Sequence, residues 1–233
     1  MTETGTIVVV IPTYNERDNI QRLVPEVLAV DPAISVVIVD DNSPDGTGAT
    51  ADVLAAANPG RIDVLHRGEK NGIGPAYIAG FQHALTRQPR LVAQMDADRS
   101  HQPDDLRKLI EAASDADLVL GSRYVPGGAT RGWPIHRRLM SQFGGLYARL
   151  ILGVHVRDMT GGFKVYRAST LSSLDIGSLQ SDGYVFQIET TFRAIKRGFR
   201  VVEVPITFVD RVAGKSKLSR GIVIEAMLRV WRL

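Results

Sequence analysis

Residues 6–16 read Thr6-Ile-Val-Val-Val-Ile11-Pro12-Thr-Tyr-Asn-Glu16, and a second run, Ser35-Val-Val-Ile-Val39, follows a helical pattern at Glu16–Val30. Both runs are continuous, β-branched and as long as a strand, which is typical of strands buried on both faces. Two such strands joined by a helix predict a parallel pair with a crossover connection. This stretch therefore predicts an α/β fold.

The same alternation continues along the first half of the chain, which predicts a sheet with helices on both faces. Pro25 interrupts the first helical pattern and predicts a kink or break there. With 233 residues and no cysteine, the chain suffices for one large domain or two small ones and has no disulfide scaffold. The further strands are expected at Arg61–Leu65, Leu91–Met95 and Leu118–Leu120, and the further helices at Gly46–Ala57, Pro75–Leu85 and Pro103–Ala113.

Polar residues follow three of the predicted strands: Pro12–Glu16, Asp40–Gly46 and Asp96–Asp98. Ligands of parallel sheets bind beyond the carboxyl ends of the strands, so these segments are candidate site residues. Two side chains have a structural explanation instead. Asn15 is predicted to cap the helix that follows it, and Asp45 to belong to an ordinary turn.

Asp96 and Asp98 follow the apolar run Leu91–Met95 directly. Two like charges at the buried end of a strand repel one another unless a cation joins them. Mg²⁺ and Mn²⁺ prefer oxygen ligands, keep several waters and are often shared between one or two carboxylates and a substrate phosphate. The pair therefore predicts a divalent metal site.

Four motifs in order, Pro12-x-Tyr-Asn-Glu16, Val39-Asp-Asp-Asn-Ser43, Lys70-Asn-Gly-x-Gly74 and Asp96-Ala-Asp98, resemble the nucleotide-sugar half of family 2 glycosyltransferases with the GT-A fold. The resemblance implies a single GT-A catalytic domain over residues 1–233, with a donor half at about 1–122 and an acceptor half at about 123–233. It implies that Asp98 binds the metal on the diphosphate. The residues implied to contact the nucleotide sugar are Pro12, Tyr14, Glu16, Asp40, Asp96 and Ala97.

The segment Gly72-Ile-Gly74 also raises the possibility of a dinucleotide-binding loop. That fingerprint requires a third glycine three residues later, and position 77 is Tyr. We therefore expect a tight turn that enters the helix near Pro75, and no NAD site.

The net charge of +3 conceals a division along the chain. Residues 1–120 carry 10 basic against 18 acidic side chains, and residues 121–233 carry 18 against 7. Residues 121–160 contain six arginines, no lysine and one acid, Asp158. Arginine binds phosphate bidentately, so an anionic acceptor or a diphosphate is expected here, with a solvated face as the alternative. The low aromatic content, the acidic first half and the lack of an RNA-binding motif argue against nucleic acid.

Three later motifs, Asp158-Met-Thr-Gly-Gly-Phe-Lys164, Asp182-Gly-Tyr-Val-Phe-Gln-Ile-Glu189 and Val209-Asp-Arg-Val-Ala-Gly-Lys-Ser-Lys217, extend the resemblance to the dolichol/polyprenol-phosphate mannose synthases. The similarity then spans nearly the whole chain. It implies inverting transfer of mannose from GDP-mannose to a polyprenyl (dolichyl-type) monophosphate, with Mg²⁺ or Mn²⁺ as cofactor.

The chemistry of this reaction assigns provisional roles. A phosphate monoester is largely dianionic at pH 7 and needs no general base, so the protein must mainly neutralise and orient charge. We expect Asp98, with Asp96, to act at the leaving diphosphate, and Arg123 at the reacting phosphates. The acceptor phosphate is expected to contact Arg137 or Arg138, together with Arg211, Lys215 and Lys217, unless the last three form only an exposed basic turn. Candidates for contacting sugar hydroxyls are Asp158, Asp182 and Glu189, the last of which is alternatively a buried structural acid.

One departure from the family pattern concerns the metal site. Arg99 stands where an apolar residue is frequent, and Ser100 stands two positions after Asp98, where it is a poor metal ligand. Two other functions stay open. One is transfer of glucose from UDP-glucose, because Asp40 and its neighbours do not reveal the base or sugar; the other is a catalytically silent scaffold, against which intact Asp96, Asp98 and Arg123 argue.

The lipid acceptor requires a membrane, but no run reaches the roughly 18 apolar residues that span a bilayer. Ser219–Leu233 carries apolar residues at helical spacing with arginines elsewhere, which fits either a helix packed on the core or an interfacial helix. We expect a peripheral protein at the cytosolic face of a membrane. A partner subunit or a fused membrane domain would provide an anchor.

Overall fold

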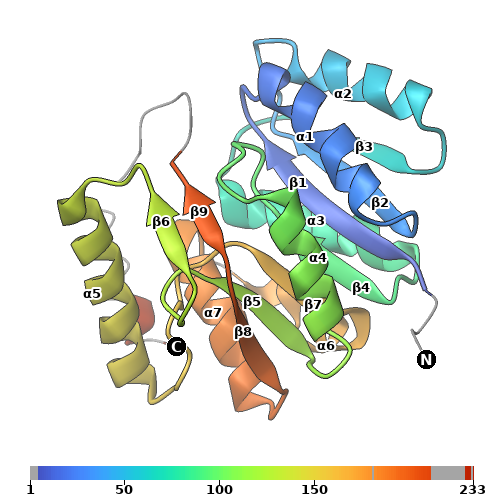
Figure 1. The fold of residues 1–233 in the computed structure, drawn as a ribbon. Coiled ribbons are helices and arrows are strands. Elements are labelled where there is room, and N and C mark those ends of the chain that lie inside the picture. The colour runs from blue at the N-terminus through green and yellow to red at the C-terminus, as the bar shows by residue number, and fades with distance from the viewer. Residues whose placement is uncertain (1–4, 180, 211–228, 232) are drawn as a thin grey trace.

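A seven-stranded sheet forms the centre of the molecule, in the order β3-β2-β1-β4-β7-β5-β8 (Figure 1). The structure is a computed structural model that describes residues 5–179, 181–210, 229–231 and 233. The strands of this sheet are β1 Ile7–Thr13, β2 Ile34–Asp40, β3 Ile62–His66, β4 Leu91–Gln94, β5 Leu118–Ser122, β7 Lys164–Arg167 and β8 Val201–Pro205.

The sheet is parallel except at β7, which runs antiparallel to both of its neighbours, β4 and β5. The chain proceeds outward from β1 to β2 and β3, and then returns to place β4 on the other side of β1. The strand order therefore reverses between β1 and β4. Ligands of open α/β sheets bind at such a reversal, which lies here between the segments after Thr13 and Gln94.

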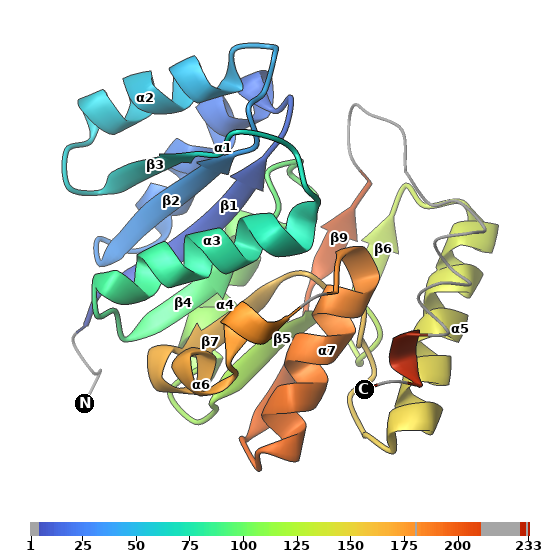
Figure 2. The same cartoon turned by 180° about the vertical axis from the view of Figure 1, so that it is seen from behind.

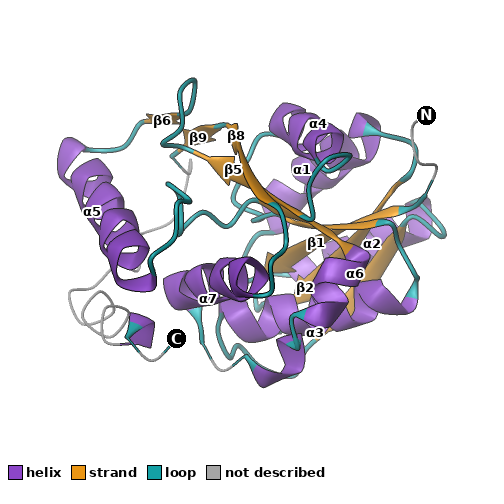
Figure 3. Cartoon of the chain, turned by 90° about the horizontal axis from the view of Figure 1, so that it is seen from below, coloured by secondary structure: helices purple, strands orange, loops and turns teal. Residues whose placement is uncertain are grey.

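Helices cover both faces of the sheet (Figures 1, 2 and 3). One hydrophobic core includes Ile20, Leu23 and Leu106 from α1 and α4, and the other includes Phe81 and Phe186 from α3 and α7. The strands carry apolar residues to both cores because successive side chains point to opposite faces. The helices are α1 Arg17–Val30, α2 Thr47–Ala57, α3 Ile73–Thr86, α4 Pro103–Ala112, α5 Ile135–Leu152, α6 Ala168–Ser173 and α7 Gly183–Lys196, with a 3₁₀ turn, η1, at Ile176–Ser178.

The predicted elements of the first half are all present, within two residues at each end. The break or kink expected at Pro25 is not a break, because α1 runs from Arg17 to Val30 with Pro25 inside it. Pro25 lies on the exposed side of α1, and the apolar side that includes Leu23 and Val24 is buried. Burial of that side holds the helix together although proline removes one backbone hydrogen bond.

The prediction that Asn15 caps α1 is wrong. The residue at the cap position is Glu16, and no side chain forms a capping hydrogen bond. Asn15 instead adopts φ 61° and donates its backbone N–H to Ser43 Oγ at 3.0 Å. Asp45 does form a turn, because its carboxylate accepts hydrogen bonds from the backbone N–H and the hydroxyl of Thr47.

A two-stranded sheet, β6 Ala129–Arg131 with β9 Thr207–Val209, lies between the main sheet and α5 (Figures 1 and 2). Helix α5 therefore stands at the side of the molecule and contributes little to either core, with Gly145 and Ala148 as its buried residues. Within the described residues, no helix is long and apolar enough to cross a membrane.

Candidate functional site

The two aspartates after β4 lie at the reversal of the sheet, and both are held by hydrogen bonds. Tyr77 on α3 donates its hydroxyl to Asp96 Oδ1 at 2.7 Å. Ser100 donates its backbone N–H and its hydroxyl to Asp98 Oδ1, at 3.0 and 2.6 Å. Burial, with Asp96 nearby, raises the pKa of Tyr77 well above its usual value, so its hydroxyl remains a donor.

His101 supports the same turn from within the protein. It is buried, its Nδ1 lies 3.1 Å from the backbone nitrogen of Asp96, and its ring stacks on Phe163. Because Nδ1 accepts that N–H, it carries no proton. Burial lowers the pKa of His101 further, although the neighbouring carboxylates oppose this shift. His101 is therefore neutral and fixes the backbone at Asp96.

The donor set at this turn fits a divalent cation with few protein ligands. Among the described residues, no group of three or more His, Cys, Asp or Glu side chains is placed to bind a metal. Asp96 and Asp98 would supply two carboxylates, and a hard cation keeps waters and takes substrate phosphate oxygens in the other positions. Ser100 orients the carboxylate of Asp98 instead of presenting a free oxygen, in line with its poor suitability as a metal ligand. Arg99 turns away and contacts Glu26 on α1.

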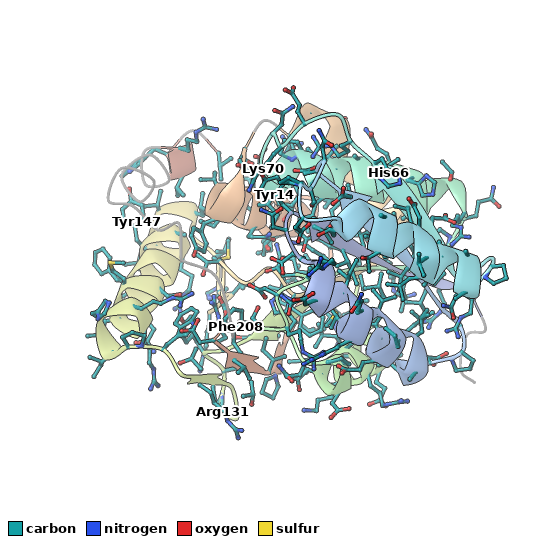
Figure 4. The ribbon with its side chains drawn as sticks, turned by 90° about the horizontal axis from the view of Figure 1, so that it is seen from above. Tyr14, His66, Lys70, Arg131, Tyr147 and Phe208 are labelled. Atoms are coloured by element: carbon teal, nitrogen blue, oxygen red, sulfur yellow. The ribbon has the colours of Figure 1, made fainter. Side chains whose placement is uncertain are left out.

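The predicted nucleoside residues gather where β1 and β2 end. Asp40 is buried, and its carboxylate accepts hydrogen bonds from the hydroxyl of Thr13 and from the backbone N–H and hydroxyl of Ser43. Tyr14 follows Thr13, and the ammonium of Lys70 lies 3.4 Å from the centre of its ring (Figure 4). This cation–π contact places a positive charge beside an aromatic face at the reversal of the sheet.

Asp41 and Arg67 lie next to this group and carry opposite charges. Arg67 forms an ion pair with the largely buried carboxylate of Asp41. Burial raises the pKa of Asp41, and Arg67 opposes this shift. Pro12 and Glu16 lie at the same end of β1, where the backbone N–H of Glu16 donates to Thr47 Oγ1 and its carboxylate accepts from Asn19.

Arg123 and Asp158 form a buried ion pair. The guanidinium donates from Nε to Asp158 Oδ2 at 2.8 Å and from Nη2 to Oδ1 at 2.6 Å, with a further bond to Thr160 Oγ1. Burial alone would raise the pKa of Asp158, but Arg123 more than offsets this, and the carboxyl pKa is lowered. The two charges predicted to act separately on phosphate and sugar are therefore bound to one another.

Aromatic rings connect this ion pair to the aspartate turn and to α5. Phe208 packs edge-on against both His101 and Trp133. The guanidinium of Arg123 lies 5.4 Å from the ring centres of Trp133 and Phe208, and that of Arg137 lies 4.2 Å from Trp133. Figure 4 places Phe208 between the α5 side and the rest of the molecule. The turn with Asp96 is thus linked to Arg137 at the start of α5 through a continuous series of packed rings.

The basic residues expected at the acceptor differ in what the structure describes. Arg137 forms an ion pair with Asp210 at 2.7 Å, and Arg138 is exposed on the first turn of α5. Arg211, Lys215 and Lys217 lie outside the described residues, as does most of Ser219–Leu233.

The two remaining candidate sugar-binding acids have protein partners. Asp182 accepts the backbone N–H of Gly74 at 2.7 Å, at the start of α3. This contact requires glycine at position 72, because a Cβ there would overlap the carboxylate of Asp182, and its φ is +99°. Glu189 is buried, accepts the hydroxyl of Ser181 and pairs with Arg193 at 2.6 Å. These contacts favour the structural explanation of Glu189.

Sequence reasoning missed several residues of this region. Tyr77, Gln187 and Lys164 received no role, because their partners are distant in sequence, although Gln187 and Lys164 lie within the motifs that carry the family resemblance. His101 offered a weak signal, since it stands five residues after Asp96 in a short polar run.

A family model described as glycosyl transferase family 2 matches residues 8–174. The chain belongs to this family. It is therefore a glycosyltransferase, and the region described above contains the segments that the family resemblance marked as donor-binding. The chain is 48% identical over 228 residues to a polyprenol monophosphomannose synthase of Mycolicibacterium smegmatis, covering 97% of this chain and 86% of that protein. It is also 48% identical over 226 residues to an undecaprenyl-phosphate mannosyltransferase of Micrococcus luteus, covering 97% and 93%.

Solved structures of other glycosyltransferases share the fold. A mannosyltransferase from Pyrobaculum calidifontis, in complex with GDP-Man and Mn²⁺, superposes with a TM-score of 0.63 at 19% identity, covering 92% of this chain and 59% of that one. Glucosyl-3-phosphoglycerate synthase from Mycobacterium tuberculosis, with Mn²⁺, UDP-glucose and phosphoglyceric acid, gives 0.70 at 19% identity, covering 98% and 80%. The family 2 glycosyltransferase thus has the α/β, GT-A architecture that its sequence predicts.

Proposed function

We propose that this glycosyltransferase transfers mannose from GDP-mannose to a polyprenyl monophosphate, with inversion at the anomeric carbon. The observation that carries the proposal is the continuous region from Asp96 and His101, through Phe208 and Trp133, to Arg137 at the start of α5. In this proposal, the diphosphate of the donor binds at the Asp96 end of the region, and the phosphate of the acceptor binds at the Arg137 end. The two relatives at 48% identity bear the names of polyprenyl-phosphate mannosyltransferases, which supports the sugar and the acceptor.

The donor is assigned to the ends of β1, β2 and β4. The nucleoside is proposed to bind beside the ring of Tyr14 and the carboxylate of Asp40. The other residues assigned to this binding site are Pro12, Glu16, Lys70 and Ala97. Asp96 and Asp98 would hold Mg²⁺ or Mn²⁺. When bound, such a cation withdraws negative charge from the leaving diphosphate. Tyr77 and Ser100 each hold one of the two carboxylates in place by a hydrogen bond.

The acceptor phosphate is assigned to the arginine-rich side of the region. A dianionic phosphate oxygen attacks without a general base, so the basic side chains need only bind and orient it. Arg137 is held by Asp210, and Arg138 is exposed beside it. Arg211, Lys215 and Lys217 follow Asp210 in sequence and are proposed to join them. Arg123 contributes positive charge next to the same rings, although Asp158 neutralises much of it.

The outer side of α5 is proposed to contact the membrane that holds the acceptor. Its exposed apolar side chains recur at helical spacing, and Ile135 and Phe143 are 76% and 62% exposed. Basic residues, including Arg138 and Arg149, lie along the same helix, and Trp231, 67% exposed, donates its indole N–H to Tyr147 on α5. An apolar face with flanking arginines and a tryptophan suits a helix lying in the lipid interface. The apolar residues are Ile135, Leu139, Met140, Phe143, Leu146 and Leu150.

A radiolabel assay tests the reaction. GDP-mannose and UDP-glucose are supplied in parallel with polyprenyl phosphate and either Mg²⁺ or Mn²⁺, and label is followed into the organic phase. We expect a mannolipid from GDP-mannose, lost on chelation, with a β-anomeric configuration from an α-linked donor. Product from UDP-glucose alone would support the glucosyltransferase instead, and no product from either donor would contradict the enzyme assignment.

A further inference from the structure

Gln187 on α7 lies next to the donor site, in a buried polar layer that holds it in one orientation. Its Oε1 accepts the amide N–H of Gln94 at 2.8 Å, and its backbone carbonyl accepts Lys164 Nζ at the same distance. The Tyr166 hydroxyl lies 3.5 Å from Gln94 Oε1, which leaves Nε2 as the Gln94 atom facing Gln187. Gln187 is therefore fixed through both its side chain and its backbone, with its own Nε2 directed elsewhere.

That nitrogen lies beside Gly162, where the backbone carries no side chain. A Cβ placed on Gly162 would lie 3.5 Å from Gln187 Nε2 and 3.6 Å from Asp96 Oδ2. The other oxygen of Asp96 is bonded to Tyr77, so the carboxylate orientation is also determined. The N–H donor of Gln187, on α7, and the carboxylate acceptor of Asp96, in the turn after β4, thus lie on either side of the same point above Gly162.

We propose that Gln187 is a sugar-binding residue, donating a hydrogen bond from Nε2 to a hydroxyl of the donor hexose above Gly162. A hydroxyl both accepts and donates, so the same group can accept from Gln187 and donate to Asp96 Oδ2. This inference rests on the proposed function in placing the nucleotide sugar at Asp96. It deepens that function by naming a residue that recognises the sugar and not the nucleotide.

The composition of the layer supports a recognition role. Burying polar groups costs free energy unless each finds a partner, and an apolar layer of the same shape would avoid that cost. Here Lys164 is fully buried, and all three of its partners are uncharged: Gln187 O, Thr190 Oγ1 and Thr191 Oγ1. A buried amine held this way positions the α7 backbone at Gln187. A site that must reject sugars lacking a hydroxyl benefits from a donor held in place before the sugar binds.

Two variants test the inference by different means. Gly162→Ala adds a methyl group that meets Gln187 and Asp96 at ordinary van der Waals distances of 3.5 and 3.6 Å, so it obstructs a ligand between them without displacing either side chain. Gln187→Glu keeps the acceptor for Gln94 but removes the N–H donor. The matched controls are Gly177→Ala, where a Cβ meets only Gln82 at 3.8 Å, and Gln82→Glu on the exposed side of α3.

Binding of GDP-mannose and of GDP is measured by titration calorimetry for each protein, with Mg²⁺ present. We expect both test variants to weaken GDP-mannose binding by tenfold or more and to change GDP binding by less than twofold, with neither control altered. Unchanged GDP-mannose binding in Gly162→Ala would overturn the inference, as would parallel loss of both ligands. If Gln187→Glu does not fold, Gly162→Ala decides the result alone.

The outcome is separable from that of the proposed function. If the wild-type protein uses UDP-glucose and not GDP-mannose, the mannosyltransferase proposal fails, and the same titrations with UDP-glucose and UDP still test Gln187. If the wild-type protein transfers mannose and both variants bind GDP-mannose normally, only the role of Gln187 fails.

Discussion

Arg123 and Asp158 stand 35 positions apart in the chain and meet as a buried pair with two parallel hydrogen bonds, from Nε to Oδ2 and from Nη2 to Oδ1. Trp133 and Phe208 flank the guanidinium. The pair lies beside the region proposed to join donor and acceptor, so two contributions are tested below, one to stability and one to phosphate binding. These can be separated by substitution.

Asp158→Ala is expected to destabilise the protein by about 3–5 kcal/mol, because it leaves Arg123 buried without a counter-charge. The double variant Arg123→Met with Asp158→Leu removes both charges and should recover most of that stability. Denaturant unfolding measures both. If Arg123 also acts on phosphate, the double variant remains folded but loses transferase activity. If the folded double variant kept full activity, the ion pair would have only a structural role.

Asp98→Asn should abolish transfer while leaving the fold intact, because it removes the carboxylate charge proposed to hold the metal. Ser100→Ala should retain a reduced activity, lower by about 10–100-fold, since Ser100 only orients that carboxylate. Turnover is measured with circular dichroism as the check on folding. A wild-type protein that is fully active with excess chelator would exclude the assigned metal.

Lys164 should make stability depend on pH. Burial lowers its pKa to about 7 from an ordinary 10.5, with Asp158 acting in the opposite direction. Between these values the unfolded chain binds a proton that the folded protein lacks, so this residue's contribution to stability increases as pH rises from about 7 toward 10. Lys164→Met should remove that dependence, whereas Lys196→Met, which replaces an exposed lysine at the end of α7, should retain it. Unfolding free energies at pH 6, 7, 8 and 9 provide the comparison; parallel curves for wild type and Lys164→Met would contradict it.

Leu139→Glu with Phe143→Glu places two charges on the outer side of α5. We expect weaker binding to vesicles that contain anionic lipid, and lower activity on acceptor embedded in them, because charged side chains disfavour the lipid interface. Activity on a short-chain, water-soluble acceptor should be unaffected. Val53→Glu is the matched control, since Val53 is 70% exposed on α2, a helix with no proposed membrane contact. Equal vesicle binding by both variants would argue against the α5 surface.

Local periodicity was sufficient to predict most of the first half of the fold. The strand runs are continuous because both faces of the sheet are covered, and their ends place Asp40, Asp96 and Asp98 at one edge without any knowledge of long-range contacts. Pro25 and Asn15 show where local rules fail. At Pro25 the buried side of α1 outweighs a missing hydrogen bond, and near Asn15 a contact with Ser43, 28 residues away, replaces the expected cap.

By itself, the sequence determined the family, the α/β architecture and the place of Asp40, Asp96 and Asp98 at the strand ends, because each depends on residues close together in the chain. Only the tertiary structure decided which charges neutralise one another. Arg123 pairs with Asp158, Lys164 inserts among uncharged groups of α7, and Gln187 approaches Asp96 across Gly162. These relationships join segments dozens of residues apart, and burial sets the strength of each charge, so no local pattern could have specified them.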